Sequence, residues 1–168
     1  WCRPPSPPET AVSLQDQVAI VTGGSRGIGR AICQALAEQG ATVIATARDP
    51  EKVRAWSADS PVAARIVPAA LEVTDRAADM QLIEDVVAQR GRLDILVNNA
   101  GITRDGLLMS MDDEQFDEVL TTNLRAAFWL IRAASRHMVR ARSGRIINIS
   151  SVSCVTGNAG QANYAAAK

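Results

Sequence analysis

Three side chains near the end of the sequence are suited to acid–base chemistry: Ser151, Tyr164 and Lys168. Lys168 follows Tyr164, the only tyrosine, by four positions, so both side chains project from one face if this stretch is helical. A phenol with its ordinary pKa of about 10 is a poor acid at neutral pH, but a nearby ammonium stabilises the phenolate. We therefore expect Tyr164 to donate a proton to a carbonyl oxygen during reduction, Lys168 to tune it, and Ser151 to hydrogen-bond that oxygen.

A glycine-rich stretch early in the sequence is a second candidate site. The apolar run at 18–21 leads through Thr22 into residues suited to a tight turn before a helix: Gly23, Gly24, Ser25, Arg26, Gly27, Ile28 and Gly29. Glycines allow a sharp turn and a close backbone approach to a pyrophosphate, and the start of the following helix offers free N–H groups. The stretch therefore predicts a dinucleotide site.

Three other interpretations of this stretch stay open. The glycines can form a turn that binds nothing. Residues 23–27 also match the Gly-x-Ser-x-Gly turn of α/β-hydrolases, but we expect His137, the only histidine, to be solvated within a charged helical segment. Residues 24–29 have P-loop glycine spacing, yet Arg30 and Ala31 stand where that motif has lysine and a hydroxyl residue.

The elements that must position these residues alternate along the chain. We expect strands at 18–22, 42–46, from 65, 93–97 and 145–149, and helices at 28–39, 50–56, from Thr74, from Asp112 and at 163–168. Strands that are apolar throughout are typical of a parallel sheet buried on both faces. The pattern predicts an α/β fold, a doubly wound parallel sheet of Rossmann-like type, in one domain at residues 15–168.

Composition narrows the classes of partner. The sequence has 18 basic and 18 acidic residues, which gives no electrostatic reason to expect nucleic acid or an anionic membrane. No apolar run approaches the ~20 residues of a membrane helix. Cys2, Cys33 and Cys154 lack the spacing of a zinc site or a disulfide framework, so we expect no metal and a reducing cytoplasm. Proline-rich residues 1–14 are expected to form a disordered extension.

The candidate sites together resemble those of the short-chain dehydrogenase/reductase family. The resemblance rests on the Thr-Gly-x-x-x-Gly-x-Gly spacing from Thr22, the Asn-Asn-Ala-Gly motif at 98–101, and Ser151 with Tyr-x-x-x-Lys at 164–168. It covers residues 15–168 and implies the fold of that family, which normally continues well beyond the lysine. Within the family, residues 98–105 and 157–164 are most similar to the 3-oxoacyl-[acyl-carrier-protein] reductases.

The resemblance implies roles for further residues. Asn123 lies at the border of an apolar stripe on the helix from Asp112, where a buried amide needs partners; in the family an asparagine here orients a water in the proton relay to the lysine. The implied cofactor contacts are residues 23–29, Arg48, Glu72, Val73, Asn99, Ala100, Gly101, Tyr164 and Lys168. The implied substrate contacts are Ser151 and Tyr164. The family usually has aspartate or asparagine where this chain has Glu72.

Charge at the end of the second strand indicates which cofactor is preferred. NAD-specific members of the family place a carboxylate there to hold the ribose hydroxyls, and the resemblance aligns Ala47 with it, followed by Arg48. Arg48 and Arg26 suit a 2′-phosphate, so NADP(H) is expected in preference to NAD(H). Asp49 remains an alternative ribose ligand if the alignment shifts by two positions.

The resemblance also implies a reaction. It is the NADPH-dependent reduction of a 3-oxoacyl thioester of acyl-carrier protein or coenzyme A to the (3R)-3-hydroxyacyl thioester in fatty-acid biosynthesis, by a cytoplasmic homotetramer. Because the last part of the family fold is missing, a non-catalytic dinucleotide-binding fragment stays an alternative, as does another short-chain carbonyl reductase or alcohol dehydrogenase. A basic cluster can dock an acidic carrier protein or be only a solvated helix end: Arg136, Arg140, Arg142 and Arg145.

Overall fold

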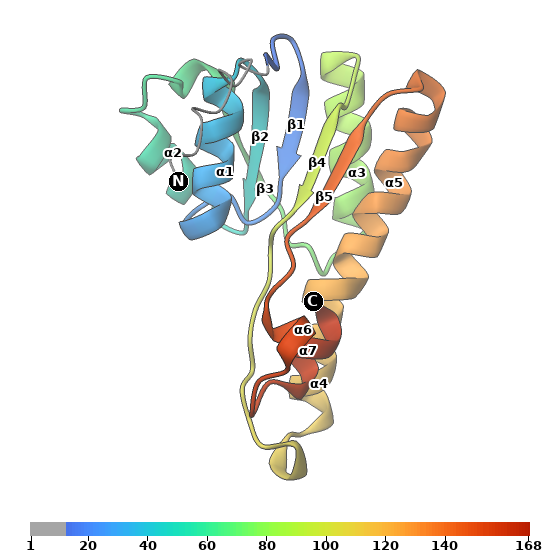
Figure 1. Ribbon diagram of the computed structural model, residues 1–168. Coiled ribbons are helices and arrows are strands. Elements are labelled where there is room, and N and C mark those ends of the chain that lie inside the picture. Colours follow the sequence, from blue (N-terminus) through green and yellow to red (C-terminus); the bar gives the residue numbers. More distant parts are fainter. Residues whose placement is uncertain (1–12) are drawn as a thin grey trace, which may run out of the picture.

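A parallel β-sheet forms the centre of the molecule. The computed structural model describes residues 13–168, so the predicted extension at 1–14 lies almost entirely outside the described residues. The sheet has five parallel strands in the order β3-β2-β1-β4-β5 (Figure 1). They are β1 (Val18–Val21), β2 (Thr42–Ala47), β3 (Ile66–Ala70), β4 (Ile95–Asn98) and β5 (Arg145–Asn148). This order, in which the sheet grows first to one side of β1 and then to the other, confirms the predicted doubly wound α/β fold.

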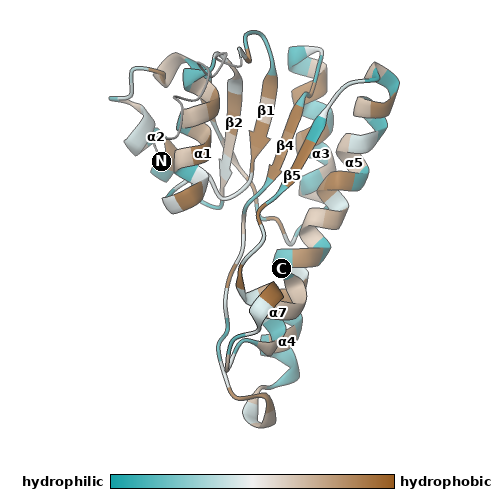
Figure 2. Ribbon diagram, in the orientation of Figure 1, coloured by the Kyte–Doolittle hydropathy of each residue, from teal (hydrophilic) through white to brown (hydrophobic). Residues whose placement is uncertain are grey.

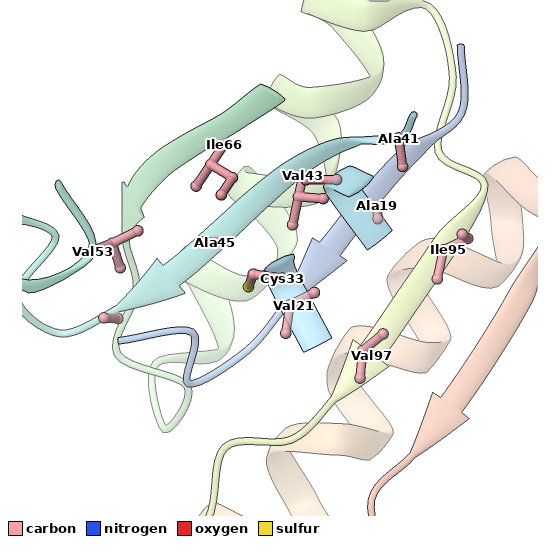
Figure 3. Close-up of a cluster of buried hydrophobic side chains, with 12 residues drawn as sticks. Ala19, Val21, Cys33, Ala41, Val43, Ala45, Val53, Ile66, Ile95 and Val97 are labelled. Atoms are coloured by element: carbon pink, nitrogen blue, oxygen red, sulfur yellow. The ribbon is translucent and has the colours of Figure 1, made fainter. Parts of the chain in front are cut away.

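Helices cover both faces of the sheet. One face carries α1 (Gly27–Glu38) and α2 (Glu51–Ser57), and the other carries α3 (Arg76–Arg90) and α5 (Ala126–Ala141) (Figure 1). Neighbouring strand residues serve opposite layers, because Val21 packs in the cluster on the α1 side (Figure 3) and Ile20 packs with α3 and α5. Burial on both faces explains why the strands lack alternating polar residues. Among residues 13–168, no helix combines the length and the apolar character needed to cross a membrane.

A group of short elements extends beyond the carboxyl ends of β4 and β5 (Figure 1). It contains the 3-10 turn η2 (Leu108–Ser110) and helices α4 (Asp113–Leu120), α6 (Ser153–Thr156) and α7 (Ala162–Ala167), with α4 packed against α7. A further 3-10 turn, η1 (Ala63–Arg65), precedes β3. Figure 2 shows hydrophobic residues along the central strands and polar residues where β4 gives way to the next segment. Polar side chains therefore gather at the carboxyl end of the sheet.

One predicted helix cap is wrong. Thr74 does not cap α3; instead the Asp75 carboxylate accepts hydrogen bonds from the backbone N–H groups of Ala77 (2.9 Å) and Ala78 (3.2 Å). The long helix predicted from Asp112 is present, but it is not α-helical throughout, because the π-helical turn η3 (Thr121–Arg125) joins α4 to α5 without a break. Such turns are frequent at functional sites, and η3 contains Asn123.

The two edges of the sheet differ in their protection. β3 contains Pro68, which has no backbone N–H and is tolerated because this strand lies at an edge. At the other edge, β5 pairs with β4, and all four of its residues are exposed. The Ile147 side chain is 43% exposed. The strand that leads to Ser151 and Tyr164 is thus also the less protected edge strand of the sheet.

Candidate active site

The glycine-rich turn lies between β1 and α1. Its Gly24 N–H donates to the Thr46 carbonyl oxygen of β2 at 2.8 Å, which fixes the turn beside the end of that strand. Gly29 belongs to the first turn of α1, and a Cβ there would lie 2.1 Å from the Gly23 carbonyl oxygen. Nothing lies within 4 Å of the position that a Cβ on Gly27 would occupy, and Gly27 has a φ of +54°. The turn is therefore closed on its inner side and open to an incoming group on its outer side.

Thr22 and Asn99 fasten this turn to the segment after β4. The buried Thr22 hydroxyl accepts hydrogen bonds from the backbone N–H groups of Asn99 (2.9 Å) and Ala100 (3.0 Å). The Asn99 amide nitrogen in turn donates to the Thr22 carbonyl oxygen at 2.8 Å. Two predicted cofactor segments, at 23–29 and 99–101, are thus held as one rigid unit. In the sequence, Thr22 was only the first residue of the glycine-rich motif, and its hydrogen-bonding role was not predicted. A hydroxyl residue at the end of a buried strand could have indicated that role.

Two arginines flank the neighbouring strand end. Arg26 lies in the turn and Arg48 directly follows β2; both side chains are exposed. Because β1 and β2 are paired neighbours, the ends of these strands adjoin. Asp49, the alternative ribose ligand, accepts a hydrogen bond from the Glu51 N–H (3.1 Å) and lies 4.0 Å from the Lys52 ammonium. Two cationic groups are therefore available at this end of the sheet, while the adjacent carboxylate already has local partners.

Tyr164 and Lys168 line one cavity together with residues of the turn. This outer cavity has a volume of about 420 Å³. Its lining comprises Arg26, Ile28, Asn99, Gly101, Ile102, Thr103, Arg104, Ile149, Ser150, Tyr164 and Lys168. Tyr164 lies in the first turn of α7, and Lys168 directly follows the last residue of that helix. The fold therefore brings the predicted acid–base pair next to the predicted cofactor turn.

Lys168 also borders a second, more apolar cavity behind the first. This inner cavity has a volume of about 330 Å³, and Lys168, Ile149 and Ser150 line both cavities. Burial lowers the pKa of Lys168 below its ordinary value. A Cβ on Gly101 would lie 3.1 Å from Asn123 Oδ1 and 3.2 Å from Lys168 Nζ, so these two side chains converge on Gly101. The lysine thus lies between the two cavities, close to Asn123.

Asn123 has its hydrogen-bonding partners within the protein. Its Oδ1 accepts from the Ile102 N–H at 2.8 Å and its Nδ2 donates to the Ile102 carbonyl oxygen at 2.9 Å. The side chain is buried and lines the inner cavity. The apolar stripe on which it was placed is only partly buried, since Leu124 is 52% exposed. Asn123 therefore fixes the segment that forms one wall of the outer cavity.

Ser151 is absent from the residues that line these two cavities. Its Oγ accepts a hydrogen bond from the Ser153 N–H at 3.2 Å, at the start of α6. Ser150, which sequence reasoning passed over, lines both cavities, and its hydroxyl donates to the Lys168 carbonyl oxygen at 2.8 Å. The two serines are adjacent in the chain after β5, but of the two only Ser150 lines the cavities. No pattern of neighbouring residues in the sequence distinguishes them.

The remaining predicted contacts are distributed around the same end of the sheet. Val73 and Ala100 line the inner cavity. Glu72 is exposed, and its carboxylate accepts hydrogen bonds from the Thr74 N–H (3.3 Å) and hydroxyl (3.0 Å). Among the described residues, no group of three or more His, Cys, Asp or Glu is placed to hold a metal ion.

The hydrolase interpretation is not supported by the position of His137. The prediction that this side chain is solvated is wrong, because it is only 17% exposed and its Nε2 lies 3.0 Å from Glu84 Oε1 of α3. His137 is near the end of α5, which leads to the amino end of β5, whereas Ser25 follows the carboxyl end of β1. The two residues therefore lie at opposite ends of the sheet.

Comparisons with known proteins extend over most of the chain. The model of the short chain dehydrogenase family matches residues 17–168. The 3-oxoacyl-[acyl-carrier-protein] reductase FabG of Escherichia coli (strain K12) is 48% identical over 157 residues, which cover 94% of this chain and 64% of the relative. The corresponding protein of Thermotoga maritima is 41% identical over 156 residues, 92% of this chain and 63% of the relative.

A solved structure gives the same result in three dimensions. A protein from Sinorhizobium meliloti 1021, assigned to the short-chain alcohol dehydrogenases, matches with a TM-score of 0.87 and 36% sequence identity. The match covers 94% of this chain and 63% of that chain. The present chain thus spans a little less than two thirds of the length of the relatives it matches.

Proposed function

Because the chain belongs to the short-chain dehydrogenase/reductase family, we propose that it serves the NADPH-dependent reduction of a 3-oxoacyl thioester to the (3R)-3-hydroxyacyl thioester. The observation that carries this proposal is the outer cavity, where Tyr164 and Lys168 lie beside Arg26 and Ile28 of the glycine-rich turn. The identity of 48% to a reductase named for this substrate class supports the choice of substrate.

The residues around the turn fit a dinucleotide. The outer side of Gly27 is open, and α1 begins there, so its free N–H groups could hold a pyrophosphate. Asn99, Ala100 and Gly101 would form the adjoining wall, and Glu72 and Val73 would border the adenine. When bound, the reduced nicotinamide supplies a hydride to the carbonyl carbon.

The chain itself supplies the proton. The Tyr164 phenol donates it to the carbonyl oxygen as the hydride reaches the carbon, so that the ketone becomes a hydroxyl group. The Lys168 ammonium, half-buried beside it, stabilises the phenolate that remains. Ser151 lines neither cavity in this structure, but its Oγ only accepts a hydrogen bond from the Ser153 N–H, so its hydroxyl hydrogen stays free. In the proposal this hydroxyl turns toward the substrate oxygen and polarises it. Lys168 then passes a proton back to the phenolate and takes up another from solvent, which restores Tyr164. Asn123 holds the Ile102 backbone and lines the inner cavity together with Lys168, and we assign it to this relay.

The proposal includes a preference for NADP(H) over NAD(H). Arg26 and Arg48 are exposed beside the adjoining ends of β1 and β2. Guanidinium groups bind phosphate through charge-assisted hydrogen bonds, and a 2′-phosphate distinguishes NADP(H) from NAD(H).

The biological setting forms part of the same proposal. The substrate is a thioester of acyl-carrier protein or coenzyme A, and the reaction belongs to fatty-acid biosynthesis. In its full-length form the protein acts in the cytoplasm as a homotetramer. Arg136, Arg140 and Arg142, on α5 and directly after it, are exposed, but α5 ends toward the amino end of β5. This basic surface therefore lies at the opposite end of the sheet from the outer cavity, and the proposal does not assign the carrier protein to it. A second candidate is cofactor binding without turnover. One observation favours it: the chain spans only 64% of the length of the Escherichia coli reductase.

Two measurements on this chain test the proposal. The first is thermal unfolding with saturating NADPH or NADH; a ligand at one hundred times its Kd adds about 2.7 kcal/mol and shifts the midpoint by several degrees. The second is oxidation of NADPH by a 3-oxoacyl-coenzyme A thioester, with Tyr164→Phe as the control. Stabilisation together with turnover that requires Tyr164 supports the reductase. Stabilisation without turnover supports a module that only binds the cofactor. If the chain shows neither stabilisation nor turnover, both candidates are excluded.

A further inference from the structure

Asn163 is a fully buried amide one position before Tyr164. Its side chain is 0% exposed, and it lies in the first turn of α7. A buried amide is tolerated only where its donors and its acceptor find partners. Asn163 is also absent from the residues that line the outer and inner cavities, so any effect it has on the chemistry is indirect.

The Asn163 amide joins three separate segments. Its Nδ2 donates to the Arg104 carbonyl oxygen at 2.9 Å and to the Gln115 carbonyl oxygen of α4 at 3.4 Å. Its Oδ1 accepts from the Tyr164 N–H at 2.7 Å. Because this N–H belongs to the first turn of α7, it has no carbonyl partner within the helix. One side chain thus ties the backbone of Tyr164 to the segment after β4 and to α4.

The contacts around Asn163 show that these segments are fastened at this point. The Gly106 N–H donates to the Gly160 carbonyl oxygen at 2.9 Å, parallel to the Asn163–Arg104 contact. The Arg104 guanidinium forms two hydrogen bonds with the Glu118 carboxylate of α4, at 2.7 and 2.8 Å. The same segment begins at 99–101, which is attached to the glycine-rich turn through Thr22. Asn163 is therefore the buried end of a continuous connection between the turn and Tyr164.

We propose that Asn163 is a positioning residue for Tyr164, which couples the placement of the phenol to the wall of the cofactor cavity. This proposal rests on the function proposed above, since it assigns Tyr164 the proton transfer. Asn163 does not touch the reacting atoms; it holds the start of α7 against residues 104 and 115. Without it, the helix and the outer cavity both persist, but the phenol is no longer kept at a fixed place relative to the cavity wall.

The experiment uses the fact that Tyr164 is the only tyrosine. A chain labelled with ¹⁵N-tyrosine gives one amide signal, and its exchange with solvent reports directly on the N–H that Asn163 accepts. In Asn163→Ala we expect this exchange to become at least about tenfold faster and kcat for NADPH oxidation to fall by roughly tenfold to a hundredfold. The Kd for NADPH, from thermal shift, is expected to stay within about twofold because the lost contact lies outside the cavity.

Two further variants complete the test. Asn158→Ala is the matched control. It removes an exposed amide in the turn before α7, and the Nδ2 of this amide donates to the Gln161 side chain. We expect this variant to change neither the exchange of the Tyr164 amide nor kcat. Asn163→Ser retains a short acceptor for the Tyr164 N–H and serves if the alanine variant does not fold; we expect intermediate exchange and turnover. Wild-type exchange and kcat in a folded Asn163 variant would overturn the proposal, as would equal losses of kcat and NADPH affinity. If the wild-type chain oxidises no NADPH, the proposed function fails, whereas the Tyr164 amide signal still decides the role of Asn163.

Discussion

The Lys168 ammonium donates a hydrogen bond to the Ile149 carbonyl oxygen, with Nζ and O 3.0 Å apart. Ile149 directly follows β5, and its own N–H donates to the Asn98 carbonyl oxygen of β4 at 2.9 Å. The position of the Lys168 side chain is therefore fixed by the sheet as well as by the short helix α7. The half-buried position of Lys168 lowers its pKa, because burial disfavours the charged ammonium. The hydrogen bond to Ile149 therefore holds an ammonium group that loses its proton more readily than an exposed lysine does.

Replacing this lysine is expected to abolish proton transfer while the cofactor turn stays intact. In Lys168→Met we expect turnover to fall by about a hundredfold or more, the usual contribution of acid–base catalysis, and the bond to Ile149 to be lost. Steady-state oxidation of NADPH measures the effect. Lys52→Met, which removes an exposed ammonium on α2, is the matched control. Equal turnover in Lys168→Met and the wild type would contradict the assigned role.

The lowered pKa of Lys168 predicts how activity varies with pH. A lysine whose pKa is depressed by burial loses its charge at a lower pH than an exposed lysine does. We therefore expect turnover to decline on the alkaline side earlier than an ordinary lysine would allow, because the neutral amine no longer stabilises the phenolate. A pH profile of kcat measures this decline. Lys168→Arg, which stays protonated, should shift or remove the alkaline decline even if its overall turnover is low.

A methyl group on Gly29 is expected to disrupt the cofactor turn. The added Cβ would lie 2.1 Å from the Gly23 carbonyl oxygen and 2.5 Å from Asn99 Nδ2, so the backbone must move. We expect Gly29→Ala to cost roughly 3 kcal/mol or more, to lower Tm by at least about 6 °C, and to abolish stabilisation by NADPH. Gly106→Ala is the control, because a Cβ added there would lie 4.0 Å from the Gln115 Oε1 atom and so meets no clash. Unchanged Tm and NADPH binding in Gly29→Ala would contradict the geometry of the turn.

Asp79 is expected to make the fold less stable as pH rises. Its carboxylate is buried in α3, and neither oxygen has a hydrogen-bond partner among residues 13–168; burial, with Asp75 and Glu72 nearby, raises its pKa to about 7. The unfolded carboxyl ionises near an ordinary pKa of about 3.9, so the folded state binds more protons between about pH 4 and pH 7. Stability should therefore decrease across that interval and level off above it.

Removing the Asp79 charge tests this assignment. Asp79→Asn should raise Tm by several degrees at pH 8, change it little near pH 4, and flatten the pH dependence between these values. Asp85→Asn, which neutralises an exposed carboxylate on the same helix, is expected to leave the pH dependence as it is in the wild type. A pH dependence in Asp79→Asn as steep as in the wild type would assign the effect to another group.

Arg48 is expected to contribute to cofactor choice. Removing one charge-assisted contact to a 2′-phosphate typically weakens binding by roughly tenfold to a hundredfold, so Arg48→Ala should reduce the thermal shift with NADPH and leave that with NADH unchanged. Arg54→Ala, which removes an arginine of α2 that pairs with Glu51, is the control. Equal effects of Arg48→Ala on both cofactors would speak for a general rather than a phosphate-specific contribution.

The parts of the site that depend on local periodicity could be predicted from the sequence. The four-residue spacing of Tyr164 and Lys168 places both on the lining of one cavity because it matches the helical repeat. The π-helical turn around Asn123 could not be predicted, since a single inserted residue per turn leaves no pattern in side-chain type. The Thr22–Asn99 hydrogen bonds join residues 77 positions apart and depend on the pairing of β1 with β4. The different surroundings of Ser150 and Ser151 likewise follow from the path of the chain after β5.

The exposed edge of β5 gives the folded molecule a surface that can pair with another strand. Its backbone groups on the side away from β4 face solvent, and Ile147 adds an apolar side chain to the same strip. Such an edge accepts any extended segment that can continue the sheet, including the same strand of a neighbouring molecule. We therefore expect association of these 168 residues, if they are studied alone, to increase with their concentration even while each copy stays folded.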